Sequence, residues 1–199
     1  MKSKKSPGRP RVFDTDAALE CAMQVFWRKG YEGASLSDLT RSMGINRPSL
    51  YAAFGNKKAL FHKALERYNE GPAAYVKDAL KQPTARAFVE HLLRGAADLQ
   101  TDPRTPPGCL MVLGALACGE KAFALRKELN MRRAAGEAVV RKRLEQAQSE
   151  GNLPADANPA DLARYVVTVI QGMAVQAVGG ATRADLEGVI RMVLRAWPK

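Results

Sequence analysis

Residues 35–56 read SLSDLTRSMGINRPSLYAAFGN, and this stretch decides the fold. Ser35 and Asp38 have the spacing of a capping box, in which each side chain satisfies a free backbone N–H at a helix start. Gly44 can take the positive φ that ends this helix, and Asn46 can cap the next one. A helix, a short glycine turn and a second helix form the helix-turn-helix layout, which is typical of DNA-binding proteins.

Helical periodicity continues on both sides of this stretch. Apolar side chains recur every three or four residues upstream, which predicts an amphipathic helix with Thr15 as N-cap and Gly30 at its end. Downstream, Asn56 is the expected cap of a long helix. The predicted helices of this unit cover about 16–29, 36–43 and 47–54, with a fourth beginning at Lys57.

The remaining sequence predicts further helices separated by glycine and proline breaks, with no strand-like alternation. We therefore expect an all-α protein. An N-terminal helix-turn-helix domain with a basic N-terminal arm would occupy residues 1–60. A helical ligand-binding and dimerisation domain would occupy residues 61–199.

The charge balance favours a polyanionic partner. The 199 residues include 31 Lys and Arg against 20 Asp and Glu, a formal net charge of +11. Nucleic acid is the first expectation, an anionic membrane surface the second, and plain solubilising charge the alternative. The longest apolar stretch, around Gly108 to Gly119, is too short to span a membrane, so a cytoplasmic protein is expected.

Motifs for metal or cofactor chemistry are missing from the sequence. The three cysteines, Cys21, Cys109 and Cys118, form no CxxC pair, and the two histidines, His62 and His91, lie near no cysteine. We expect no metal, no cofactor and no enzymatic activity. A basic helical protein that coats nucleic acid without sequence preference remains an alternative.

Several runs of the first 62 residues resemble the DNA-binding domain of the TetR/AcrR family. These runs are FD at 13–14, AMQVFWRKGY at 22–31, SLSDL at 35–39, GINRPSLYAAFGNK at 44–57 and LF at 60–61. The resemblance implies a homodimeric repressor that leaves a near-palindromic operator when a small effector binds. An activator of the same family is the alternative.

The exposed side of the helix over 47–54 is the expected DNA-reading surface. Arg47 is the expected base-reading side chain, with Ser49 and Ala52 as neighbours able to touch bases. Phosphate contacts would come from Tyr51 and from residues flanking the helix. The predicted DNA-binding residues are Ser35, Ser37, Arg47, Pro48, Ser49, Tyr51, Ala52 and Lys57. In the arm, Gly8-Arg9-Pro10 resembles the core of an AT-hook, which binds a narrow minor groove.

The last two predicted helices indicate a dimer. The helix after Pro159 is apolar almost all round, and the one from Arg183 to Trp197 has a wide apolar face. A partner chain is the simplest cover for such helices, and in the family the two C-terminal helices pair with their mates as a four-helix bundle. Gly172 would let the backbones approach closely. The predicted interface residues are Val166, Ile170, Ala174, Ile190 and Leu194.

A mostly apolar effector cavity is expected beneath the segment from Gly108 to Glu120. This segment follows a proline-rich loop and contains small residues, and adaptable or aromatic side chains surround it. The predicted lining is Phe88, Leu92, Cys109, Met111, Phe123, Tyr165 and Met173, and close packing of the same residues is the alternative. Cys109 and Cys118 are either small core residues or reactive thiols.

Overall fold

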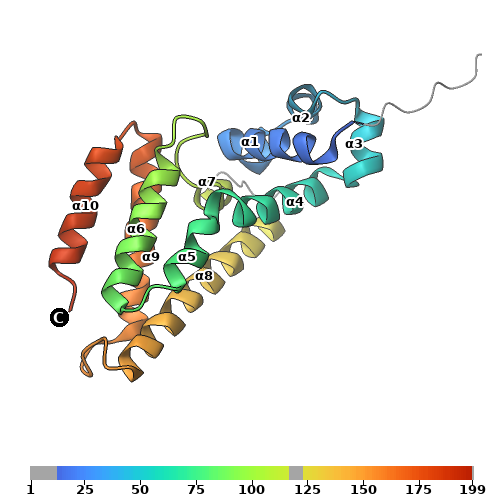
Figure 1. Cartoon of the computed structure of the whole chain (residues 1–199). Coiled ribbons are helices and arrows are strands. Elements are labelled where there is room, and N and C mark those ends of the chain that lie inside the picture. Colours follow the sequence, from blue (N-terminus) through green and yellow to red (C-terminus); the bar gives the residue numbers. More distant parts are fainter. Residues whose placement is uncertain (1–12, 117–122, 199) are drawn as a thin grey trace, which may run out of the picture.

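The computed structural model describes residues 13–116 and 123–198. All regular secondary structure in these two ranges is helical, which confirms the predicted fold class (Figure 1). A compact group of helices lies at one end of an elongated molecule, and longer helices form the other end. None of the described helices combines the length and the hydropathy that a membrane span requires.

The N-terminal group has the predicted helix-turn-helix order. Its helices are α1 (Thr15–Gly33), α2 (Leu36–Met43), α3 (Arg47–Phe54) and α4 (Lys57–Glu70). The Asn46 and Asn56 caps are confirmed. The N-cap of α1 is Asp14 instead of the expected Thr15, because Asp14 Oδ1 accepts hydrogen bonds from the N–H groups of Asp16 and Ala17. Gly30 has a positive φ of 66°, and a short helical segment follows this break.

The larger C-terminal group contains a 3-10 turn and six helices within the described residues. They are η1 (Pro72–Ala74), α5 (Tyr75–Leu80), α6 (Ala85–Gln100), α7 (Leu110–Leu116), α8 (Phe123–Ser149), α9 (Pro159–Val178) and α10 (Arg183–Arg195). Helix α6 packs against both α9 and α10, and the long α8 packs along α9 (Figure 1). The last helix ends at Arg195, two residues before the expected Trp197.

Two hydrophobic clusters hold the molecule together. The first joins α1–α4 to Leu110 of α7 and to Leu125 and Leu129 of α8. The second joins α5, α6, α9 and α10 to the C-terminal half of α8. The expected division after residue 60 falls inside α4, whose buried side as far as Tyr68 belongs to the first cluster. The two groups of helices therefore share a core instead of meeting at a linker.

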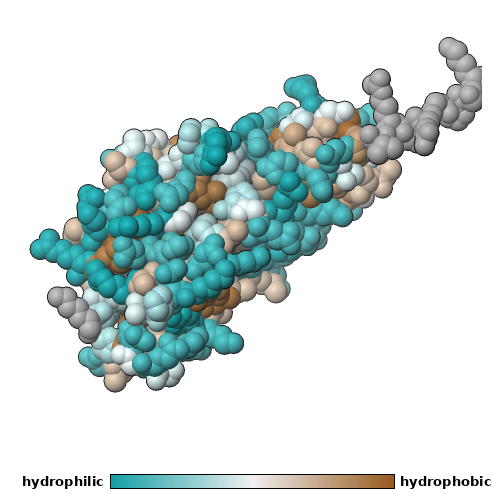
Figure 2. Space-filling model, in the orientation of Figure 1, coloured by the Kyte–Doolittle hydropathy of each residue, from teal (hydrophilic) through white to brown (hydrophobic). Residues whose placement is uncertain are grey.

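The outer surface of the molecule is largely polar on the face shown in Figure 2. Figure 2 shows a mostly hydrophilic face that is broken by small apolar patches. Among the large apolar side chains that the structure describes, the largest exposed fractions belong to Met192 at 65%, Met131 at 63% and Phe123 at 60%. Exposed apolar groups of this size are candidates for contacts with other molecules when they gather on one face.

Two glycines in helices test how tightly the fold is packed. At Gly95 of α6, an added Cβ would lie 2.4 Å from the ring of Tyr75 in α5, whereas at Gly136 of α8 it would meet nothing within 4 Å. We expect Gly95→Ala to lower the free energy of unfolding by about 1–3 kcal/mol through overpacking. Gly136→Ala should raise it by up to about 1 kcal/mol, because alanine favours the helix. Urea unfolding of both variants measures this, and equal effects would contradict the packing at Tyr75.

Candidate nucleic-acid interface

The turn between α2 and α3 fixes the direction of α3. Gly44 adopts the left-handed conformation, with φ of 66° and ψ of 25°, and the Ile45 N–H donates to the carbonyl of Thr40. Asn46 Oδ1 then accepts a hydrogen bond from the Ser49 N–H at 2.9 Å. Leu50 and Phe54 are buried. The opposite side of α3 therefore faces solvent, as a DNA-reading helix requires.

The structure brings Arg47 and Ser37 together. Arg47 Nη2 donates a hydrogen bond to Ser37 Oγ at 3.1 Å, which links the start of α3 to α2. Both side chains are exposed, as are Pro48, Tyr51 and Ala52, whereas Ser49 is half-buried. The guanidinium group is thus held on the solvent side of α3 with donors free to contact the edge of a guanine.

The Ser35 hydroxyl caps the N-terminus of α2. Its hydroxyl donates to Asp38 Oδ2 at 2.7 Å and accepts from the Asp38 N–H, so the predicted capping box is confirmed. Lys29 Nζ lies 2.9 Å from Asp38 Oδ1. Hydrogen bonds from Lys29 and then from Ser35 lower the pKa of Asp38 to about 2, so this carboxylate stays charged at neutral pH. The role of Ser35 in phosphate binding remains a prediction.

Lys57 is held in place by an aromatic ring. Its Nζ lies 4.6 Å from the centroid of the Tyr31 ring, near the start of α4. Partial burial lowers the pKa of Lys57, and the charge of Glu32 opposes this shift. The neighbouring Lys58 is exposed. Sequence reasoning missed the parts played by Tyr31 and Lys29, because these contacts join residues that are far apart in the chain.

The structure does not gather the seven predicted effector-binding residues around one cavity. Phe88, Leu92 and Met173 are buried in the second cluster, whereas Phe123 and Tyr165 are exposed. For Phe88, Leu92 and Met173 this arrangement matches the alternative of close packing. The sequence could not distinguish the two cases, because residue type does not determine which side of a helix a side chain faces.

The remaining two, Cys109 and Met111, are half-buried and pack against the first cluster. Cys109 Sγ accepts a hydrogen bond from the Tyr68 hydroxyl at 3.3 Å. Part of the segment expected above the cavity, including Cys118, lies outside the described residues, as does the Gly8-Arg9-Pro10 motif.

Four of the five residues expected in the dimer interface are instead buried within one protomer. Val166, Ala174 and Ile190 are fully buried and Leu194 is 8% exposed, whereas Ile170 is half-buried. Helices α9 and α10 pack these side chains against their own chain, so they contribute little to the surface of the protomer. The large apolar residues of α9 and α10 that face solvent are Tyr165, Val175, Val178, Val189 and Met192.

Comparison with known proteins agrees with this geometry. The family model described as "Bacterial regulatory proteins, tetR family" matches residues 18–64, and the model described as "Tetracyclin repressor-like, C-terminal domain" matches residues 83–193. The HTH-type transcriptional repressor ComR of Escherichia coli (strain K12) is 35% identical over 198 residues, which cover 98% of this chain and 94% of ComR.

Two solved structures are similar along nearly the whole chain. A cysteine mutant of the TetR family transcriptional regulator CifR, complexed with 26-base-pair double-strand operator DNA, is 43% identical with a TM-score of 0.91. That match covers 96% of this chain and 100% of the CifR chain. A putative TetR transcriptional regulator from Rhodococcus sp. RHA1 is 37% identical with a TM-score of 0.62, over 94% of this chain and 100% of that one.

The fold and the exposed α3 surface define a helix-turn-helix transcriptional regulator. The two matching family models together cover most of the chain, and the matches to ComR and CifR cover 98% and 96% of it. The chain belongs to the TetR family of bacterial regulatory proteins.

The exposed position of Arg47 makes it the side chain to test first. We expect Arg47→Ala to weaken binding to a specific operator by about 1–3 kcal/mol while leaving affinity for random duplexes almost unchanged. The matched control is Arg141→Ala, which removes an exposed arginine of α8 that is paired with Glu145. Titrations of both DNAs at one salt concentration measure the difference, and an equal loss on both would remove Arg47 from base reading.

Proposed function

We propose that the protein is a homodimeric repressor that binds a near-palindromic operator and leaves it when a small molecule binds the helical domain. The observation that supports this most directly is the exposed surface of α3, where Arg47 donates a hydrogen bond to Ser37 of α2. The matched CifR structure contains operator DNA, and ComR is named a repressor. We place this action in the cytoplasm and assign no catalytic step to the chain.

The proposed operator geometry follows from two-fold symmetry. Two protomers related by a two-fold axis would present two copies of α3, one to each half of an inverted repeat. The two helix-turn-helix domains of the dimer would together bind DNA more tightly than one alone, because the second contact is made within an already bound complex. Effector binding would favour a conformer in which the two α3 helices of the dimer no longer match the spacing of the half-sites.

Selection from a pool of random duplexes tests the DNA-binding part of the proposal. We expect the bound fragments to converge on an inverted repeat whose half-sites are about one helical turn apart. A reporter gene placed behind the selected sequence should then be expressed less when the protein is present. Fragments without a common sequence would indicate a non-specific nucleic-acid coat, and increased reporter expression would indicate an activator.

The proposed dimer interface consists of the exposed sides of α9 and α10. Tyr165, Thr168, Gly172 and Val175 follow one another at steps of three and four residues along α9, and none of them is buried. This spacing is typical of helices that pack in four-helix bundles. A dimer through this surface would cover apolar side chains that otherwise face water.

Met192→Arg tests this surface without disturbing the protomer core, because the Met192 side chain is 65% exposed. We expect this variant to stay folded but to be monomeric at micromolar concentration, since the interface would bury an unpaired charge. Its operator affinity should fall by about 100-fold or more through lost avidity. The control is Met131→Arg, which changes a methionine of α8 that is 63% exposed. Sedimentation measures the assembly, and a dimeric Met192→Arg variant would place the interface elsewhere.

A further inference from the structure

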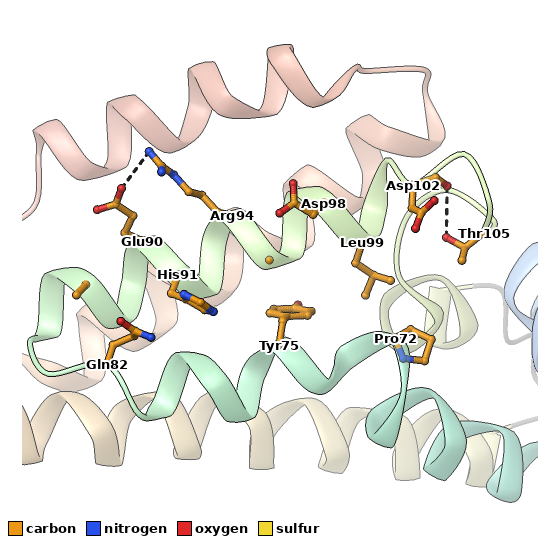
Figure 3. A pocket seen from close by; sticks show the side chains of 12 residues that line it. Pro72, Tyr75, Gln82, Glu90, His91, Arg94, Asp98, Leu99, Asp102 and Thr105 are labelled. Carbon is orange, nitrogen blue, oxygen red and sulfur yellow. Dashed lines mark hydrogen bonds and ion pairs between the residues drawn. The ribbon is translucent and has the colours of Figure 1, made fainter.

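The Arg47 guanidinium, at the start of the DNA-reading helix α3, has a neutral partner. Its Nη2 donates to the hydroxyl of Ser37 at 3.1 Å, and it makes no other hydrogen bond or ion pair among the described residues. Arg94, an exposed arginine of α6, is instead paired with the carboxylate of Glu90 at the groove between α6 and the η1–α5 segment (Figure 3). Arg47 therefore keeps its full positive charge for a partner outside the protomer.

The Ser37 hydroxyl is available to Arg47 because it takes no part in capping α2. The capping box at the start of this helix joins Ser35 and Asp38. Ser37 is the second residue of α2 and is exposed, and its Oγ makes no further hydrogen bond within the described ranges. The bond from Arg47 is therefore the interaction that links this hydroxyl to the rest of the described protomer.

Local interactions fix the backbone at both ends of this contact. Lys29 pairs with Asp38 at the start of α2, and the Asn46 side chain caps α3. Gly44 sets the turn between the two helices. The Arg47 side chain is then the mobile part, because arginine has several rotatable bonds whose freedom is lost when it binds a base. A hydrogen bond that restricts the side chain before DNA binds reduces this loss.

A hydroxyl is well suited to orient an arginine that must bind DNA. It accepts a hydrogen bond without carrying a charge. A carboxylate at the same place would hold the guanidinium more tightly, but it would also neutralise the charge that attracts the side chain to DNA. The Ser37 hydroxyl therefore orients Arg47 and leaves its attraction to DNA intact.

The bond to Ser37 leaves one edge of the Arg47 guanidinium free. Arginine presents its N–H donors along the edges of a planar fork, and the donors of one edge can bind O6 and N7 of a guanine together. The two hydrogens of Nη2 belong to different edges, one shared with Nε and the other with Nη1. Because Nη2 donates a single bond to Ser37, the edge that contains its other hydrogen stays available for a bidentate contact.

We propose that Ser37 is a positioning residue, which orients Arg47 so that the free edge of its guanidinium reads a guanine in the major groove. Ser37 thereby sets the base preference at one position of each operator half-site. It acts through Arg47 instead of through the phosphate contact that the sequence predicts for it. The inference rests on the proposed function, since it concerns sequence-specific binding by the same α3 surface.

Titrations of the selected operator and its single base-pair substitutions test this assignment. Arg47→Ala identifies the base pair that Arg47 reads, because discrimination is lost there. Ser37→Ala should lower discrimination at that same base pair by about 3- to 10-fold, as expected for the loss of one exposed hydrogen bond. The other positions should be read as before. An equal loss of affinity for the operator, its substitutions and random duplexes would indicate a phosphate contact and overturn the proposal.

The Ser37→Ala, Arg47→Ala double variant separates positioning from a direct contact with DNA. If Ser37 acts through Arg47, its removal should change operator affinity by less than about twofold once Arg47 is absent. A loss as large as the one that Ser37→Ala causes by itself would contradict the proposal, because the hydroxyl would then bind DNA directly or stabilise α2.

Two further variants test the hydroxyl itself. Ser37→Thr keeps a hydroxyl at this position and should retain the discrimination of the unmodified chain. The matched control is Ser42→Ala, which removes another exposed serine hydroxyl of α2, one that donates to the carbonyl of Cys21 at 3.5 Å. We expect this control to discriminate as the unmodified chain does. A loss in either variant as large as in Ser37→Ala would show that the bond to Arg47 is not the cause.

NMR relaxation of the arginine side chains tests the positioning without DNA. The Nε–H signal of Arg47 is assigned by its absence from the spectrum of Arg47→Lys. We expect Ser37→Ala to lower the order parameter of this group, because the guanidinium loses its partner, and Ser42→Ala to leave it unchanged. Equal order parameters in Ser37→Ala and the unmodified chain would overturn the proposal. If random-duplex selection yields no operator, the proposed function fails, whereas this measurement still decides whether Ser37 holds Arg47.

Discussion

The packing of α1 against α4 holds the DNA-binding end of the molecule together. Two edge-to-face ring pairs join the helices: Phe26 with Phe61 at 4.9 Å, and Trp27 with Tyr68 at 4.8 Å between centroids. Each such pair adds about 0.5–1.5 kcal/mol beyond its burial. Trp27 is buried although its Nε1 has no hydrogen-bond partner among the described residues, which costs stability. The packing of the indole ring therefore stabilises the fold by more than its unpaired N–H group costs.

The same packing connects the DNA-reading helices to the rest of the chain. The Tyr68 hydroxyl donates to Cys109, the residue before α7, and Leu110 of α7 belongs to the same core as Trp27. Helix α7 also packs directly against α1. Helix α7 and η1 therefore contact α1 and α4 directly through packed side chains, without a flexible linker between them.

The local parts of the DNA-reading surface were predictable from sequence because their hydrogen bonds span only a few residues. The Ser35–Asp38 capping box and the Asn46 cap both join residues three positions apart. The N-cap of α1 was missed by one residue, because Asp14 and Thr15 are both good caps and the chain path chooses between them. The Arg47–Ser37 contact joins two helices, and it appears only once the turn at Gly44 sets their angle.

The positions of most helices, the helix-turn-helix and the residues exposed on α3 could be predicted from the sequence, since helix periodicity and caps are local properties. Which sides of α9 and α10 face outward could not be predicted, because long-range packing sets it. Helix α9 is apolar nearly all round, so periodicity cannot distinguish Val166 and Ala174, which are buried, from Tyr165 and Val175, which are exposed. This outcome depends on how α9 crosses α6 and α8 and on how α10 crosses α6, and packing between residues far apart in the chain sets those crossings.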